Sequence, residues 1–242
     1  MTSLLLISSS TVHGGGYLDH VETELKEFLS GIPEILFVPY ALHDRDGYAA
    51  KARERFSRLD IAVKSLHAAR DPLDAIGGAG AIFVGGGNTF RLLKTLGDLR
   101  LRRPLRKRVL EGALYIGSSA GTNLACPTIR TTNDMPIVSP SSLAALKLVP
   151  FQINAHYLDP DPGSTHKGET REERIRQLHE EPENREPVVG LRENVWLLRR
   201  GASLLLKGPA EAGARLFRPG REPTEYGAGA DLSFLLQDTA QI

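Results

Sequence analysis

The amino-acid sequence predicts an α/β protein of three layers, in which a mainly parallel sheet carries helices on both of its faces. Short, wholly apolar runs, typical of strands buried on both faces, alternate with segments whose apolar residues recur at helical spacing. The 242 residues, 41% of them hydrophobic, suffice for a full core. We therefore expect one domain over residues 1–242.

The first half of the chain alternates strand and helix in regular order. Apolar runs predict strands over residues 4–7, 35–38, 61–63, 81–84 and 114–116. Helices are expected over residues 18–29 and 49–59, in a short segment opened by Asp71 and Pro72, around residues 90–96, and from about Pro104.

The second half is less regular. A strand is expected over residues 151–153, and Thr170 and Glu173 form a capping-box pattern that begins a helix reaching about Glu180. Strands follow over residues 188–191, 195–198 and 204–206, the last two as an antiparallel hairpin. Glycine and proline interrupt the chain after Gly208, and residues 220–242 are an extension without assignment.

Charge and cysteine content argue against several classes of partner. The formal net charge is +1, so no overall field favours nucleic acid or an anionic membrane, and the basic cluster within residues 100–108 indicates a solvated helix face. Cys126 is the single cysteine, expected to pack about two turns down a helix, and it suits a reducing cytoplasm. We expect a cytoplasmic protein, monomeric or a small homo-oligomer, that binds neither nucleic acid nor membrane.

The candidate nucleophile is Ser119. It stands between Gly117 and Gly121, after an apolar strand and before a helix, which matches the sharp turn that lifts a serine hydroxyl clear of a sheet. A frame centred on Ser118 lacks glycines two positions away on either side. An unreactive glycine-rich turn is the alternative.

A serine needs a base, and the base needs a carboxylate that orients it. Among seven histidines, His156 follows an apolar strand and ranks first, with His166 second. Two acids compete for the third position, since triads occur in different chain orders. Asp134 precedes His156, and Glu193 follows the strand over residues 188–191.

The negative charge of a tetrahedral intermediate requires backbone N–H donors. We expect the amide of Ala120 to be one and an amide of the glycine loop over residues 85–88, taken as Gly87, to be the other. The same loop allows an alternative of another class, a non-catalytic module that binds a phosphate or metabolite.

Five segments together resemble the peptidase E family of α-aspartyl dipeptidases. They are residues 84–90, 113–117, 119–121, 123–138 and 166–172, in family order and spacing within a match over roughly residues 3–207. The resemblance implies a fold similar to class I glutamine amidotransferases and hydrolysis of Asp-X dipeptides without a metal or cofactor. Relatives that degrade cyanophycin or isoaspartyl peptides are the alternative within this group.

The resemblance also assigns residues. It implies Ser119 as nucleophile and His156 as base, and it matches both Asp134 and Glu193 to residues proposed as the acid. We favour Glu193 because it ends a strand beside the expected site, and Asp134 stays either a residue of a substrate loop or the third member itself. Asn88 is expected to contact substrate, and a cation for the aspartyl carboxylate is expected at Arg171, with Lys167 as the alternative. Ser118 and Arg192 depart from the family pattern, which commonly has tryptophan and proline there.

Overall fold

The computed structural model describes residues 1–161, 163, 165 and 168–237. Its main sheet has seven strands in the order β3-β2-β4-β5-β1-β8-β9, and the first five run parallel. β8 and β9 extend it as the predicted antiparallel hairpin. The strands are β1 (Ser3–Ile7), β2 (Glu34–Val38), β3 (Ala62–Ser65), β4 (Ala81–Val84), β5 (Leu114–Ser118), β8 (Trp196–Arg200) and β9 (Ser203–Lys207). The predicted fold class is confirmed.

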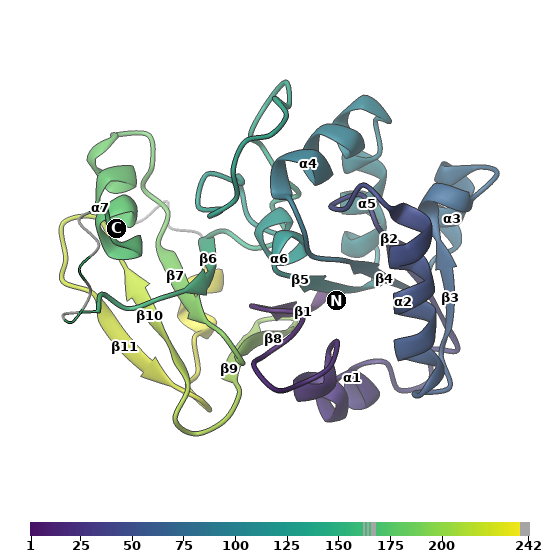
Figure 1. Ribbon diagram of the computed structural model, residues 1–242, viewed down its shortest axis with the longest axis horizontal. Coiled ribbons are helices and arrows are strands. Elements are labelled where there is room, and N and C mark those ends of the chain that lie inside the picture. Colours follow the sequence, from purple (N-terminus) through teal and green to yellow (C-terminus); the bar gives the residue numbers. More distant parts are fainter. Residues whose placement is uncertain (162, 164, 166–167, 238–242) are drawn as a thin grey trace.

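Helices cover both faces of this sheet (Figure 1). Alternate residues of β1 separate the two layers, since Leu5 and Ile7 pack with α1 and α2 whereas Leu4 and Leu6 face α4 and α5. The helical elements are η1 (Asp19–Val21), α1 (Glu22–Phe28), α2 (Arg45–Ser57), η2 (Leu66–Ala68), α3 (Pro72–Gly78), α4 (Thr89–Asp98), α5 (Arg102–Leu110) and α6 (Ala120–Leu124).

A second sheet, which the sequence does not predict, lies beside the first. Its order is β11-β10-β7-β6, with β6 and β7 parallel and the other pairs antiparallel. Its strands are β6 (Gln152–Tyr157), β7 (Val188–Arg192), β10 (Gly213–Phe217) and β11 (Thr224–Gly227), and α7 (Arg171–Glu180) lies against them. Ile153 and Val189 join the core cluster that also contains Leu4 and Leu6, so the two sheets share one core.

Several local predictions are confirmed and others need correction. Thr170 and Glu173 form the capping box at the start of α7. The helix expected from Pro104 begins at Arg102, where proline fits in the first turn because those N–H groups have no partner within the helix. α6 ends at Leu124, so Cys126 lies beyond the helix, where burial raises the pKa of its thiol to about 12.

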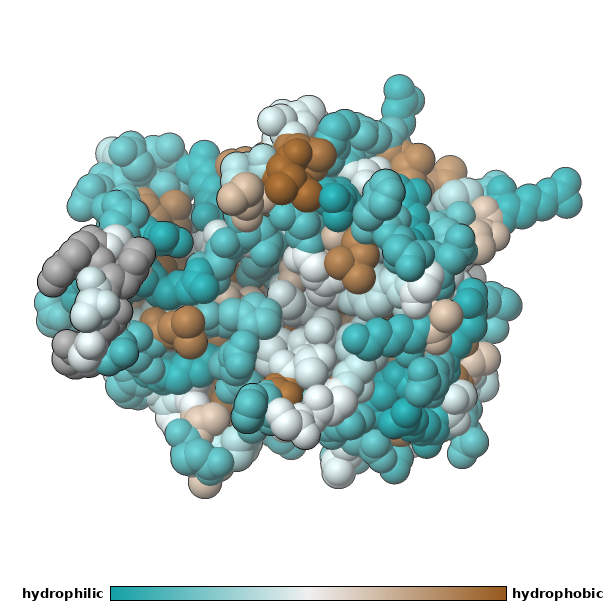
Figure 2. Space-filling view, in the orientation of Figure 1, coloured by the Kyte–Doolittle hydropathy of each residue, from teal (hydrophilic) through white to brown (hydrophobic). Residues whose placement is uncertain are grey.

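The described part of the C-terminal extension, residues 220–237, packs against both sheets. β11 pairs with β10, and η3 (Ser233–Leu236) follows a segment in which Leu232 donates a hydrogen bond to Leu204 of β9. On the face seen in Figure 2, the described residues form a mostly hydrophilic surface with small, separate apolar patches. None of the described helices combines the length and the apolar character needed to cross a bilayer.

Candidate active site

Ser119 occupies a strained turn between β5 and α6. Its backbone has φ 52° and ψ −109°, a conformation that residues with a Cβ rarely adopt and that costs about 1–3 kcal/mol. A Cβ on Gly121 would lie 2.9 Å from the carbonyl carbon of Val84, so only glycine permits this close approach of helix and strand. The Ser119 amide donates to the carbonyl of Ile7 in β1 at 3.0 Å, which ties the turn to the sheet.

His156 reaches Ser119 from the second sheet. Its Nε2 lies 2.9 Å from Ser119 Oγ, and its Nδ1 lies 2.8 Å from Glu193 Oε1. The residue sits in β6 where the register with β7 shifts between Ala155 and Tyr157, and its φ is 55°. The bulge turns the side chain toward the other sheet. The structure therefore brings these three residues together in the chain order serine, histidine, glutamate.

Glu193 follows the last residue of β7 and precedes Asn194, which has φ 64°. The three residues 193–195 join β7 of the second sheet to β8 of the first sheet. The Glu193 side chain is half exposed and the His156 side chain is 37% exposed, so a small substrate can reach the ring from solvent.

Among the described residues, Asp134 does not contact the imidazole and lies at the start of α4. Its Oδ2 accepts hydrogen bonds from the Thr89 amide at 2.7 Å, from Thr89 Oγ1 at 2.5 Å and from Thr132 Oγ1 at 3.0 Å. A carboxylate is favourable there because the N-terminus of a helix carries partial positive charge. Within the described part of the chain, Asp134 makes no hydrogen bond to His156.

The glycine loop lies directly against the serine. A Cβ on Gly86 would be 3.1 Å from Ser119 Cβ, and Gly87 has φ 130°, with the Ala41 carbonyl oxygen 2.8 Å from where its Cβ would lie. Only glycine fits at Gly87. The amides of Gly87 and Ala120 take part in none of the turn or loop hydrogen bonds among the described residues, so both are available to a ligand.

Asn88 is engaged at both ends of its side chain. Its Oδ1 accepts from the Arg91 amide at 3.0 Å and caps α4, whereas its Nδ2 donates to the Met135 carbonyl at 2.8 Å. It therefore joins the glycine loop to the loop that carries Asp134, and its contact with substrate stays a prediction.

Arg171 is the first residue of α7 and lines a pocket of about 460 Å³ together with Asn133, Leu158 and Arg174. Burial and then the positive charge of Arg174 lower the pKa of Arg171, while the charge of Asp134 acts in the opposite direction. A cation that has lost part of its hydration is well suited to bind a carboxylate. Lys167 and His166, the alternatives from the sequence, lie outside the described residues.

Ser8 is a residue of this site that the sequence analysis misses. It immediately follows β1, it is fully buried, and its hydroxyl accepts a hydrogen bond from the His156 amide at 2.9 Å. The available signal is its place after a buried strand, at the carboxyl edge where parallel sheets carry their sites.

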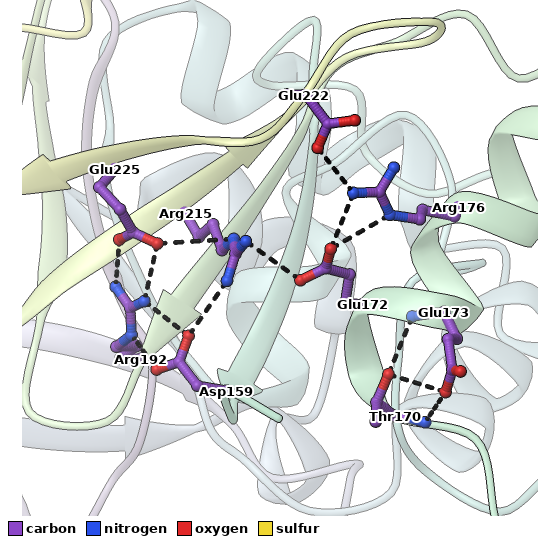
Figure 3. A network of polar contacts seen from close by, with 9 residues as sticks. All are labelled: Asp159, Thr170, Glu172, Glu173, Arg176, Arg192, Arg215, Glu222 and Glu225. Carbon is purple, nitrogen blue, oxygen red and sulfur yellow. Dashed lines mark hydrogen bonds and ion pairs between the residues drawn. The ribbon is translucent and has the colours of Figure 1, made fainter. Parts of the chain in front are cut away.

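A network of ion pairs extends from Arg192, the residue that precedes Glu193 in the chain (Figure 3). Arg192 forms a two-pronged hydrogen bond with Asp159 at 2.7 Å for each prong, and a second with Glu225 of β11 at 2.9 and 3.1 Å. Arg215 of β10 continues the network to Glu172 of α7. The arginine that departs from the family pattern thus links the end of β7 to the C-terminal strands.

Arg192→Ala is expected to lower the free energy of unfolding at neutral pH by about 1 kcal/mol, because solvent screens this partly exposed network. Its hydrogen bonds hold the pKa of the Asp159 carboxyl below the usual value. The stabilisation is therefore present above the unfolded-state pKa of about 4 and is lost as the pH falls through the lower folded-state pKa. Urea unfolding at pH 7 and at about pH 3 measures it.

The matched control is Arg221→Ala, since Arg221 is exposed and makes no ion pair among the described residues. Two results would contradict the prediction that this network stabilises the fold. One is a decrease in the free energy of unfolding at pH 7 that is equal in both variants, and the other is a decrease in Arg192→Ala that is as large at acid pH as at pH 7.

The chain is similar to known proteins over most of its length. The model of peptidase family S51 matches residues 4–207. A Streptomyces coelicolor protein named "Peptidase E" is 54% identical over 234 residues, 97% of this chain and 95% of that protein. A Drosophila melanogaster protein named "Probable alpha-aspartyl dipeptidase" is 47% identical over 238 residues, 97% and 98% of the two chains. The crystal structure of a peptidase from an acI-B1 actinobacterium has a similar fold, with a TM-score of 0.70, 20% identity and 97% of each chain covered.

Proposed function

Since the chain belongs to peptidase family S51, we propose that it is a serine-type dipeptidase that hydrolyses dipeptides whose first residue is aspartate. The observation that carries the proposal is the hydrogen-bonded series of Ser119, His156 and Glu193 at the carboxyl edge of the main sheet. The names of the two relatives, Peptidase E and alpha-aspartyl dipeptidase, support the substrate class.

In the proposed reaction, Ser119 Oγ attacks the carbonyl carbon of the N-terminal aspartyl residue. His156 Nε2 takes the hydroxyl proton and then delivers it to the nitrogen of the leaving amino acid as the peptide bond breaks. A water molecule, deprotonated by the same imidazole, then attacks the acyl carbon. The ester bond to Ser119 Oγ breaks, Oγ takes the proton from His156 Nε2, and aspartate is released. Glu193 holds the proton on Nδ1, so that Nε2 is free to accept one.

The amides of Ala120 and Gly87 are proposed to donate hydrogen bonds to the oxygen that becomes negative in the tetrahedral intermediate. Two features support this role. Ala120 begins α6, where N–H groups have no partner within the helix, and the φ of Gly87 fixes the peptide beside Ser119.

For substrate selection we propose that Arg171 binds the side-chain carboxylate of the aspartyl residue. Its half-buried guanidinium at the pocket beside Asn133 supports this role. Lys167 stays the alternative cation on the sequence alone, and Asp134 is assigned to anchoring the loop that faces α4. The hydrogen bonds of Asp134 to Thr89 and Thr132 support that assignment.

Arg171→Gln is expected to raise KM for Asp-Leu by about 10- to 100-fold with a smaller change in kcat, because a charge-assisted hydrogen bond contributes about 1.5–3 kcal/mol. Arg171→Lys keeps the charge without the planar guanidinium, so its KM is expected to lie between those of the wild type and Arg171→Gln. Arg174→Gln removes a cation from the same pocket and serves as the control. A KM that changes only in the Arg174 variant would refute the role of Arg171.

The function itself is tested by a Michaelis profile on Asp-X, Glu-X, Asn-X and β-linked Asp-X dipeptides. We expect kcat/KM to be highest for α-linked Asp-X. Preference for β-linked substrates would instead establish the isoaspartyl or cyanophycin-degrading alternative, and lack of turnover on every substrate would favour a binding module.

We further propose that residues 1–242 act as one domain in the cytoplasm, as a monomer or small homo-oligomer. The core shared by both sheets supports the first part, and the single buried Cys126 suits a reducing compartment.

A further inference from the structure

We propose that Ser8 is a positioning residue, which fixes the backbone of both His156 and Glu193 relative to Ser119. The inference rests on the proposed roles of those three residues. His156 and Glu193 come from the second sheet and must be aligned with Ser119, which belongs to the first.

The Ser8 hydroxyl makes two hydrogen bonds across the boundary between the sheets. Oγ accepts from the His156 amide at 2.9 Å and donates to the Leu191 carbonyl at 2.8 Å. The Ser8 amide donates to the Val195 carbonyl at 3.1 Å. Ser8 is fully buried, so water does not compete for these bonds.

The bond to His156 compensates for a defect in the second sheet. Ala155 pairs with Leu191 and Tyr157 pairs with Arg192, which leaves His156 between them at the bulge. A bulged residue has no partner in the ladder, and the φ of 55° is unfavourable for a side chain with a Cβ. Such a conformation persists only where its surroundings impose it. The Ser8 hydroxyl supplies that constraint.

The two other bonds hold the turn that carries Glu193. Leu191 precedes Glu193 by two residues and Val195 follows it by two, so Ser8 fixes the chain on both sides of the carboxylate. A displacement of this turn would change the distance from Glu193 to His156 Nδ1.

The preceding residue connects the same strand end to the nucleophile. The carbonyl of Ile7 accepts from the Ser119 amide at 3.0 Å and from Thr122 Oγ1 at 2.6 Å. β1 lies inside the main sheet, between β5 and β8, and its last residues are completely buried. Ile7, the last residue of this rigid strand, and Ser8, which directly follows it, therefore set the relative positions of all three groups.

The test is Ser8→Ala, assayed with Asp-Leu. We expect kcat to fall about 100-fold, because a shift of about 1 Å in a reacting group has an effect of that size, whereas KM stays close to the wild-type value. Ser8→Thr retains the hydroxyl and is expected to recover most of kcat. Ser8→Cys keeps the approximate shape with a weak hydrogen-bonding group and is expected to behave like the alanine variant.

The matched control is Ser65→Ala. Ser65 is also a buried serine at the end of a strand of the main sheet, and its hydroxyl lies 2.7 Å from His67 Nδ1. We expect its kcat to equal that of the wild type. An equal loss of kcat in the Ser65 and Ser8 variants would assign the effect to general stability and overturn the proposal.

A spectroscopic measurement separates alignment from stability. The His156 Nδ1 proton, shared with Glu193, is expected to give a downfield proton resonance that shifts or broadens in Ser8→Ala and is restored in Ser8→Thr. If Ser8→Ala does not fold, Ser8→Cys supplies the same comparison. Wild-type kcat and an unchanged resonance in a folded alanine or cysteine variant would overturn the proposal.

Failure of this inference is distinguishable from failure of the proposed function. Inactive Ser119→Ala combined with fully active Ser8→Ala rejects only the positioning role. Active Ser119→Ala rejects the reaction scheme and the positioning role together.

Discussion

Ser119→Ala is expected to lower kcat for Asp-Leu by about 10⁶-fold, the order of loss found when a serine nucleophile is removed. The acyl-enzyme cannot form without Oγ, and His156 has no hydroxyl from which to accept a proton. The residual rate should come from the amides of Gly87 and Ala120 and from substrate binding. Steady-state assays at high enzyme concentration measure it, and labelling with a fluorophosphonate probe should disappear in parallel.

The fold is expected to survive the change, because alanine keeps the Cβ and the backbone bond from residue 119 to the Ile7 carbonyl. Ser118→Ala is the matched control. Ser118 is fully buried, and its hydroxyl has no hydrogen-bond partner among the described residues, so its removal should leave kcat near the wild-type value. Turnover retained by Ser119→Ala, or lost only in Ser118→Ala, would show that the nucleophile is wrongly assigned.

The main sheet could be predicted because its signals are local. Parallel strands buried on both faces are continuous apolar runs, and Leu4 to Leu6 or Ile82 to Val84 need no distant partner to be identified. The turn at Ser119 is equally local, since Gly117 and Gly121 lie within two residues of it. The capping box of Thr170 and Glu173 spans only one helical turn.

The second sheet could not be predicted because strand pairing is not local. The run over residues 151–153 indicates a strand, yet nothing in it specifies that β6 pairs with β7 and not with the main sheet. β10 and β11 lie where glycine and proline obscure the alternation of apolar residues. Their order follows from tertiary packing, which overrides weak β-propensity.

The choice between Asp134 and Glu193 depends on the same long-range geometry. Glu193 follows the apolar run over residues 188–191 and Asp134 lies in a polar loop, yet both are compatible with a triad because triads occur in different chain orders. Contacts between distant segments distinguish the two acids. Asp134 accepts a hydrogen bond from the Thr89 amide at the start of α4, whereas Glu193, in the turn after β7, contacts His156. The sequence does not reveal the role of Ser8 for a related reason. A serine that follows a strand cannot be distinguished from other loop residues unless its hydrogen-bond partners are known.

Glu193→Gln is expected to lower kcat for Asp-Leu by about 10⁴-fold, with KM little changed. The amide that replaces the carboxylate carries no charge to stabilise the imidazolium formed when His156 takes the serine proton. It can also donate a hydrogen bond to Nδ1, which favours the tautomer whose Nε2 is already protonated and cannot act as a base. Rates on Asp-Leu, together with probe labelling of Ser119, measure the loss.

Asp134→Asn is the discriminating control, because Asp134 is the other acid that the sequence offers. Oδ2 of Asp134 accepts three hydrogen bonds at the start of α4, so its replacement should lower the free energy of unfolding by about 1–3 kcal/mol and affect kcat far less than Glu193→Gln does. The reverse ranking, in which Asp134→Asn loses most of kcat and Glu193→Gln retains it, would assign the third position to Asp134. Such a result would require the loop that carries Asp134 to leave α4 when substrate binds, because in the structure it is Glu193 that contacts the imidazole.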